Sequence, residues 1–203
     1  MMIEKKAKTS VEINDLIASR WSGRAYNPDK SVSRKDILSL LEAARWAPSC
    51  FGDQPWRYIV FDRNSDKSDW DKAFSCLSEG NQSWAVNAPV LILSIADSVM
   101  SRNNKPNRWA QYDTGAASYS LCLQAVDRGL MVHQMGGFNA DKARDLFKVP
   151  EQFTLMAMMT VGYQLPLEKL DDEIRERELS ERQRHPIDHN FFEGCWNKPF
   201  QSE

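Results

Sequence analysis

The stretch that decides the fold reads Arg20-Trp21-Ser22-Gly23-Arg24-Ala25-Tyr26-Asn27-Pro28. After one predicted helix comes Trp46-Ala47-Pro48-Ser49-Cys50-Phe51-Gly52-Asp53-Gln54-Pro55-Trp56. In the first segment Ser22 stands between two arginines, and guanidinium groups bind phosphate oxygens in a bidentate manner. The second segment is a loop broken by proline and glycine, in which Ser49 and Gln54 can hydrogen-bond a flat polar ring. Together the two segments predict a site for a flat, phosphorylated ligand.

The composition predicts one globular domain over residues 1–203. The hydrophobic content is 42%, with seven Trp and nine Phe, which indicates a packed core. The net charge of −2 gives no reason to expect nucleic acid or a membrane as a partner. Residues 1–10 are rich in lysine and have no apolar core of a signal peptide, so we expect a disordered tail there and a cytoplasmic protein.

Neither the cysteines nor the histidines have the spacing of a metal site. The cysteines lie far apart with no CxxC pair; they are Cys50, Cys76, Cys122 and Cys195. His185 and His189 are separated by Pro186, which argues against one helical face, so we expect both to face solvent. We therefore expect no metal. His133 precedes a glycine turn and is predicted to be a hydrogen-bonded core residue.

Hydrophobic periodicity and end signals predict an alternation of helices and strands without regular βαβ units, which favours an α+β fold. The expected helices cover residues 11–19, 34–47, 68–77, 114–126 and 140–147, with a charged, helical segment over 171–184. The expected strands cover residues 57–62, 89–96, 130–135 and 154–163. The sheet is expected to be mostly antiparallel, with helices on its flanks.

Two segments have more apolar surface than one chain accounts for. The predicted helix 114–126 carries no charge, so it is expected to be buried in the core or against a second subunit. Residues 185–203 form an expected extended arm with several aromatic residues, whose exposure would be costly unless they pack on something. The aromatic residues of this arm are Phe191, Phe192, Trp196 and Phe200.

Common phosphate and nucleophile motifs are absent. There is no GxGxxG after a strand, no Walker A loop and no GxSxG elbow. A second basic pair, Arg182 and Arg184, stands just before His185. Taken alone, such a pair in a charged segment is expected to face solvent.

The order of these segments resembles the nitroreductase family, dimeric enzymes that bind FMN. The opening Arg-x-Ser-x-Arg-x-Tyr-x-Pro is followed by Ala43-Ala44-Arg45-Trp46-Ala47-Pro48-Ser49 and Gln54-Pro55-Trp56-Arg57-Tyr58. Then come Asn81 before an apolar strand, Met135-Gly136-Gly137-Phe138, Val161-Gly162-Tyr163 and Arg182-Gln183-Arg184-His185-Pro186. Gln164 replaces the family's usual proline. Each motif alone is weak, but six in the family's order over residues 15–200 identify the chain as a family member.

The resemblance implies a nitroreductase-like fold and a homodimer with two interfacial FMN sites. Arg20, Ser22 and the second basic pair would hold the phosphate, and Arg24 would lie near flavin N1 and O2. Gly136 and Gly137 would lie near N5, so no side-chain general base is assigned. The implied cofactor-binding residues are Arg20, Trp21, Ser22, Arg24, Pro48, Ser49, Cys50, Phe51, Gln54, Asn81, Met135, Gly136, Gly137, Arg182 and Arg184.

Two positions depart from the family pattern. Trp84 stands where several relatives have a lysine or arginine near the pyrimidine, so one positive charge at the flavin is missing. Trp21 replaces a common arginine or histidine. Cys50 falls in the flavin-lining loop, where packing of a small residue is favoured over a redox role because the sequence places no cation beside it.

The implied reaction is ping-pong electron transfer from NAD(P)H through FMN to a nitroaromatic, quinone or similar acceptor. Two alternatives stay open at this point. One is a flavoenzyme of the same fold that dehydrogenates or dehalogenates one specific metabolite. The other is a flavin-binding dimer without turnover. Neither the acceptor nor the preference between NADH and NADPH follows from the sequence.

Overall fold

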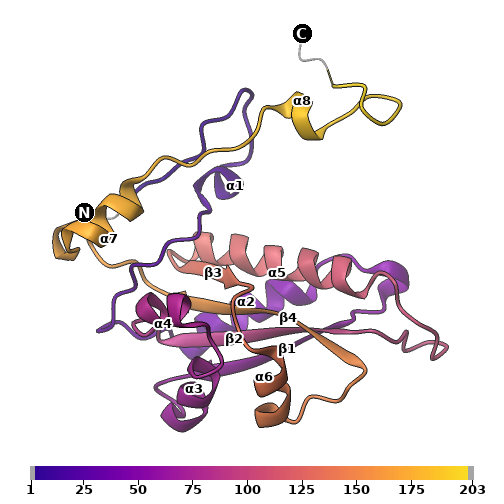
Figure 1. Cartoon of the computed structure of the whole chain (residues 1–203), viewed down its shortest axis with the longest axis horizontal. Helices are drawn as coiled ribbons and strands as arrows, with labels where there is room; N and C mark the ends of the chain where they lie inside the picture. Colours follow the sequence, from indigo (N-terminus) through magenta and orange to yellow (C-terminus); the bar gives the residue numbers. More distant parts are fainter. Residues whose placement is uncertain (1–2, 201–203) are drawn as a thin grey trace.

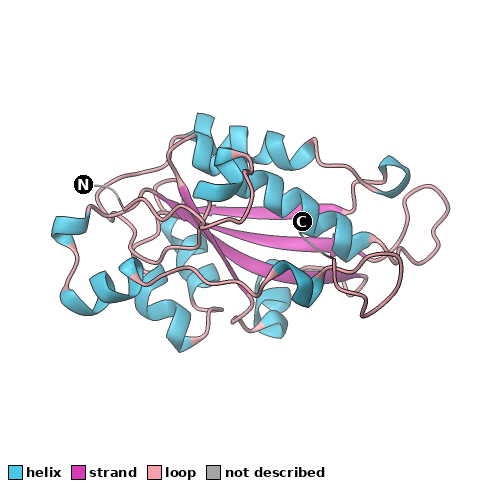
Figure 2. Cartoon of the chain, turned by 90° about the horizontal axis from the view of Figure 1, so that it is seen from above, coloured by secondary structure: helices cyan, strands magenta, loops and turns pink. Residues whose placement is uncertain are grey.

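A four-stranded antiparallel sheet in the order β1-β2-β4-β3 forms the centre of the computed structural model, which describes residues 3–200. The strands are β1 (Trp56–Asp62), β2 (Val90–Asp97), β3 (Met131–Met135) and β4 (Phe153–Gly162). Figures 1 and 2 show helices packed on both faces of this sheet. The prediction of an α+β fold with an antiparallel sheet is confirmed.

The helices divide between the two faces. On one face lie α2 (Arg34–Arg45) and α5 (Ala110–Asp127), and on the other lie α3 (Lys67–Phe74), α4 (Glu79–Ala85) and α6 (Ala140–Phe147). Shorter elements are α1 (Asp15–Ser19), η1 (Cys50–Gly52), η2 (Leu167–Lys169), α7 (Asp172–Leu179) and α8 (Ile187–Asn190). Among residues 3–200, no helix is both long and apolar enough to cross a bilayer.

Strand β2 is buried on both faces, as its apolar sequence predicts. Leu91, Leu93 and Ile95 pack with the helices α3, α4 and α6, whereas Val90 and Ile92 pack with α2 and α5. Alternate side chains of a strand point to opposite faces, so one strand supplies both halves of the core.

Helix α5 buries only one side. Its inner side packs on α2 and the sheet, with Leu121 and Ala125 fully buried. Its outer side leaves Tyr112 79% and Tyr119 40% exposed. The expected burial of this uncharged helix is therefore met on one side only within a single chain.

Several predicted helix boundaries are wrong, and one helix is absent from the prediction. The first helix begins at Asp15 rather than residue 11, because the Asn14 side chain accepts from Leu16 N and caps it there. Helix α7 ends at Leu179 rather than Arg184, since Ser180 has extended backbone angles. Helix α4 is missing from the prediction.

The two ends of the chain run side by side above α5 (Figure 1). Lys5 Nζ donates to Glu178 O at 2.8 Å, Arg182 Nη1 donates to Lys5 O at 2.8 Å, and Lys8 pairs with Glu181. The sequence predicts disorder over residues 1–10, whereas these hydrogen bonds place residues 3–10 against the C-terminal segment. We call residues 3–10 and 178–186 together the terminal strap. Beyond it, the aromatic arm over residues 187–200 projects away from the sheet.

Candidate functional site

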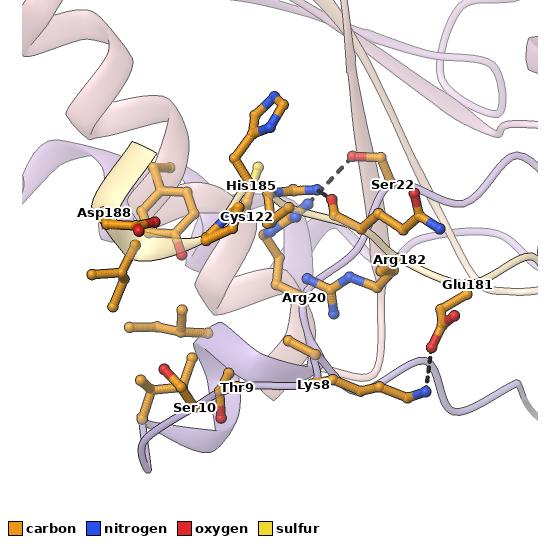
Figure 3. A pocket seen from close by; sticks show the side chains of 18 of the residues that line it. Lys8, Thr9, Ser10, Arg20, Ser22, Cys122, Glu181, Arg182, His185 and Asp188 are labelled. Atoms are coloured by element: carbon orange, nitrogen blue, oxygen red, sulfur yellow. Dashed lines mark hydrogen bonds and ion pairs between the residues drawn. The ribbon is translucent and has the colours of Figure 1, made fainter. Parts of the chain in front are cut away.

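A cavity of about 1420 Å³ lies between the terminal strap and the body of the domain (Figure 3). Its walls come from both ends of the chain and from the strand and helix beneath. The polar, charged and cysteine side chains among them are Lys8, Thr9, Ser10, Arg20, Ser22, Tyr119, Cys122, Gln134, Glu181, Arg182, Gln183, Arg184, His185 and Asp188. The cavity therefore brings Arg20 together with the second basic pair, Arg182 and Arg184, from the other end of the chain.

The arginines of this cavity have no acidic partner. Arg20 Nη1 donates to Ser22 Oγ at 3.3 Å, and Arg182 Nη1 donates to Ala18 O at 2.7 Å. Burial and the neighbouring guanidinium groups of Arg20 and Arg184 lower the pKa of Arg182. In the described part of the chain, none of these three arginines pairs with a carboxylate. An uncompensated group of planar donors of this kind favours a multivalent anion such as a phosphate.

The backbone between Arg20 and Arg24 is held tightly from below. A Cβ on Gly23 would lie 2.2 Å from Met131 Sδ and 3.0 Å from Glu178 Oε2, so a side chain cannot be placed there without a shift. Glu178, only 2% exposed, accepts from Arg24 N at 3.0 Å through Oε1. Burial raises the pKa of the Glu178 carboxyl. The segment from Arg20 to Arg24 is thus fixed between β3 and α7.

Arg24 lies over a stack of rings. Its Cζ is 5.9 Å from the Trp84 ring centroid, and the Trp84 ring lies 4.7 Å from that of His133. His133 Nδ1 lies 3.1 Å from Gly23 O, and since a carbonyl only accepts, this nitrogen carries the hydrogen. Burial lowers the pKa of His133. The predicted hydrogen bond of His133 is confirmed, but the residue is half-buried and belongs to neither core cluster.

Two polar atoms of this region are buried without a partner in the part of the chain that the structure describes. They are Arg24 Nε and Glu178 Oε2. Buried polar groups almost always form a hydrogen bond, so each of these two atoms is available to hydrogen-bond a ligand. Trp84 itself is 7% exposed and stacks on Tyr26, which leaves the Arg24 guanidinium as the cation at this point.

The end of β3 and helix α4 meet at the glycine turn. Gly137 O accepts from Ser78 N at 2.9 Å and from Asn81 Nδ2 at 3.0 Å. A Cβ on Gly137 would lie 2.8 Å from Asn81 Nδ2, whereas a Cβ on Gly136 would meet nothing within 4 Å. The structure thus joins Asn81 to Gly137 and leaves Gly136 facing open space. Gln134, two residues earlier, lines the cavity, so the turn is about 7 Å from it along the strand.

The loop around η1 is strained. Phe51, Gly52 and Gln54 have φ values of 56°, 67° and 48°. Positive φ is costly for non-glycine residues, and such residues cluster at ligand-binding loops. Asp113, at the start of α5, holds the loop by accepting from Cys50 N at 2.9 Å. Ser49 Oγ accepts from Gln54 N at 3.1 Å, so this hydroxyl also stabilises the loop itself.

This loop does not line the cavity of its own chain. Asp113 binds the loop, whereas Cys122 lines the cavity nine residues later on α5, which corresponds to about 14 Å of helix. Within one chain the structure therefore separates the predicted ring-binding residues from the arginine cluster. The separated residues are Pro48, Ser49, Cys50, Phe51 and Gln54. Trp21 and Met135 lie behind the site, packed against the core.

The comparison with known proteins decides the family, because residues 17–163 match the Nitroreductase family. This chain belongs to the nitroreductase family. The predicted family and its class of oxidoreductase are therefore confirmed. Members of one family can act on different substrates, so the match defines the enzyme class but not the electron acceptor.

Individual relatives of this nitroreductase-family chain cover most of its length. A putative NADH dehydrogenase/NAD(P)H nitroreductase of Archaeoglobus fulgidus is 29% identical over 73% of this chain and 83% of the relative. A putative NAD(P)H nitroreductase of Bacillus subtilis is 30% identical over 77% and 94%. A crystal structure described as an oxidoreductase containing FMN is 32% identical, covers 98% of this chain and 100% of that chain, and has a TM-score of 0.87.

Sequence reasoning missed several residues of the nitroreductase-family site. Tyr119 and Cys122 are three apart on one face of an uncharged helix, and this spacing was an available signal. Gln134 is the polar residue in an otherwise apolar strand end. Glu178 carried no signal, because its role depends on a contact with Arg24 across 154 residues. Burial raises the pKa of the Cys122 thiol, which keeps it protonated and inert.

Proposed function

We propose that the protein is an FMN-dependent oxidoreductase that passes electrons from NAD(P)H to nitroaromatic, quinone or similar acceptors by a ping-pong mechanism. The observation that carries this proposal is the convergence of Arg20, Arg182 and Arg184 on one cavity, where none of the three forms an ion pair with a carboxylate among the described residues. The FMN-containing structure that this chain resembles at 32% identity supports the same cofactor.

The residues present fit FMN along its length. Its phosphate carries nearly two negative charges, which several guanidinium donors and the Ser22 hydroxyl can bind. At the other end, Arg24 Nε is buried without a partner among residues 3–200 and is free to donate to a ring atom. The open space above Gly136 allows a flat ring to approach the backbone.

We also propose that the working form is a homodimer. The strained loop from Ser49 to Gln54 lies at the far end of α5 from the cavity of its own chain, so a twofold partner would supply it to the ring half of the site. The aromatic arm supports this assignment, because Phe191 is 60% and Trp196 81% exposed in a single chain. Aromatic side chains of this kind are typical of dimer interfaces.

Bound FMN would supply the redox chemistry, namely hydride and proton uptake with NAD(P)H as the donor and two-electron reduction of the acceptor. The arginine cluster anchors the phosphate and so fixes the position of the ring. Arg24 stabilises negative charge at the pyrimidine end through a preorganised positive group. Glu178 holds the Arg24 backbone N–H, and Gly137 is fixed by Asn81. No side chain is needed as a general base.

The test is spectroscopic. The purified protein should be yellow or bind added FMN, with a flavin absorption band that NADPH or NADH bleaches under anaerobic conditions. Addition of a nitroaromatic or a quinone should restore the band with one acceptor equivalent per two electrons. Flavin that stays oxidised with both nicotinamides would contradict the proposal, and a colourless protein that retains no added FMN would contradict the cofactor itself.

A further inference from the structure

The turn between β2 and α5 carries exposed cations that the proposed phosphate site does not use. Arg102, Lys105 and Arg108 are all exposed, and none pairs with a carboxylate among the described residues. The whole chain has a net charge of −2, so this positive group is a local departure from its average. Such clusters are either solvated or bind an anion.

The turn is fixed rather than loose. Met100 N donates to Lys105 O at 2.8 Å and closes the turn. Asp53 accepts from Ser101 N at 3.0 Å through Oδ1 and from Asn107 Nδ2 at 3.0 Å through Oδ2. One carboxylate therefore ties both sides of the turn to the strained loop that contains it. Both carboxylate oxygens of Asp53 accept from neutral donors, so Asp53 forms no ion pair with the three cations among the described residues.

Two of the cations are oriented by aromatic rings. The Arg102 guanidinium lies 3.6 Å from the Phe51 ring centroid, and that of Arg108 lies 4.2 Å from the Trp109 ring. Stacking over a ring face leaves the in-plane N–H groups of a guanidinium free to bind an anion. Fixing these long side chains costs conformational entropy, which a merely solvated surface would not incur.

The aromatic surface beside the turn suits a planar base. Phe51 is 72%, Trp109 38% and Tyr112 79% exposed, all next to the same loop. Cations interleaved with exposed ring faces match a ligand with several phosphates and a flat heterocycle. A dinucleotide has both, and it must reach the flavin with its nicotinamide while its adenosine end stays outside.

We propose that Arg102, Lys105 and Arg108 bind the phosphate groups of the dinucleotide donor as its nicotinamide enters the site. This inference rests on the proposed function, because the loop that carries Phe51 must line the flavin of the second subunit. Two parts of the donor have the required chemistry. The pyrophosphate is common to NADH and NADPH, and the 2′-phosphate belongs to NADPH alone.

The experiment compares donors on the FMN-loaded Arg102→Gln/Arg108→Gln variant. Stopped-flow reduction is measured with NADPH, with NADH and with 1-benzyl-1,4-dihydronicotinamide, which donates a hydride but has no phosphate. We expect the ratio of the second-order rate constant for NADPH to that for the phosphate-free donor to fall by about tenfold or more, as for lost charge-assisted hydrogen bonds. A fall for NADPH alone identifies the 2′-phosphate, and a fall for both dinucleotides identifies the pyrophosphate.

The matched control is Arg34→Gln/Lys35→Gln, which removes two exposed charges at the other end of α2, about 18 Å of helix away from the Ser49–Gln54 loop. Its donor ratio should equal that of the unmodified protein. If the Arg102→Gln/Arg108→Gln variant also has the donor ratio of the unmodified protein, the inference is overturned, because the turn then contributes nothing to donor selection.

A second readout does not depend on electron transfer. Calorimetric binding of adenosine 2′,5′-bisphosphate and of ADP to the FMN-loaded dimer should weaken by about tenfold in the Arg102→Gln/Arg108→Gln variant. Unchanged binding of both nucleotides would reject the site even if reduction proceeds. Conversely, a flavin that no nicotinamide reduces would reject the proposed function, while the binding measurement would still decide the role of the turn. FMN content and melting temperature confirm that each variant is folded.

Discussion

The arginine cavity and the loop from Ser49 to Gln54 lie at opposite ends of α5 and are supported in different ways. The cavity is built by long-range contacts, such as Arg182 Nη1 to Ala18 O at 2.7 Å, which join the two ends of one chain. The loop has local contacts, such as Gln54 N to Ser49 Oγ, and is tied by Asp113 and Asp53 to α5 and to the turn before it. Three of its residues have positive φ values. The cavity is enclosed by its own chain, whereas Phe51 of the loop points outward with 72% of its surface exposed.

This difference indicates how the site is divided. In the proposed division a single chain completes the phosphate half, because Arg20, Ser22, Arg182 and Arg184 already line one cavity within that chain. The same chain holds the loop in a strained shape without using it, and strain of this kind persists where the surrounding structure requires it for a ligand. A partner subunit that receives the loop would account for both observations.

The largest test of this comparison is the aromatic arm. We expect the Phe191→Ala/Trp196→Ala variant to lose about 4 kcal/mol of dimer stability, since central interface aromatics contribute about 2 kcal/mol each. That corresponds to a dimer dissociation constant about 1000-fold higher, measurable by sedimentation over a range of protein concentrations. FMN should be lost together with the dimer.

The control for the arm is Leu146→Ala, which removes a 40% exposed apolar side chain on α6, on the opposite face of the sheet from α5. Its dissociation constant should stay unchanged. If the arm variant remains as dimeric as the parent, or if the parent is a monomer that binds FMN tightly, the division of the site between two chains is wrong.

The next test concerns the phosphate half alone. We expect Arg20→Ala and Arg184→Ala each to weaken FMN binding by about 1.5–3 kcal/mol, the range for hydrogen bonds to a charged group. The dissociation constant of FMN, followed by quenching of its fluorescence, should rise between about tenfold and 150-fold. The dimer should persist in both variants, which separates this half from the arm.

Arg34→Ala gives the matched loss of an exposed arginine outside the cavity and should leave the affinity for FMN unchanged. Arg182→Ala should lower both FMN affinity and melting temperature, because Arg182 also donates to Lys5 O and Ala18 O in the terminal strap. Parent-like FMN affinity in both the Arg20 and Arg184 variants would remove the cavity from the cofactor site.

The sequence allowed most of the fold to be predicted, because β2 and α2 carry strong local signals. Ser33 caps α2 by accepting from Asp36 N at 3.0 Å, as the capping pattern indicates. Helix α4 was not predictable in this way, since Gly80, Asn81 and Ser83 are poor helix formers. It is stabilised instead by burial of Trp84, which is a tertiary contact.

The same distinction holds for the site. Arg20, Ser22 and Arg184 line one cavity, and the sequence indicated them through short motifs that resemble those of the family. The pairing of residues 3–10 with the C-terminal segment could not, because it depends on contacts such as Ile3 N to Gln164 Oε1 at 2.9 Å, across 161 residues. Local periodicity contains no information on such contacts, so composition indicated a tail where the structure has a wall of the cavity.

The smallest expected effect concerns His133 and the dependence of stability on pH. Burial first, and then the positive charges of Arg24 and Arg20, lower the pKa of His133 below its usual 6.5, opposed by its hydrogen bond to Gly23 O. A histidine with a lowered folded pKa stabilises the fold above its unfolded pKa, and this contribution is lost as pH falls through 6.5 toward the folded value. Urea unfolding of the FMN-loaded protein between pH 8 and pH 5.5 should therefore show decreasing stability toward acid, and His133→Asn should flatten that slope.

The variant's stability must be compared at each pH with that of His189→Asn, an exposed histidine outside the cavity whose loss should leave the slope intact. Parallel pH profiles for the His133 variant and the parent would mean that the fold does not lower the pKa of this ring.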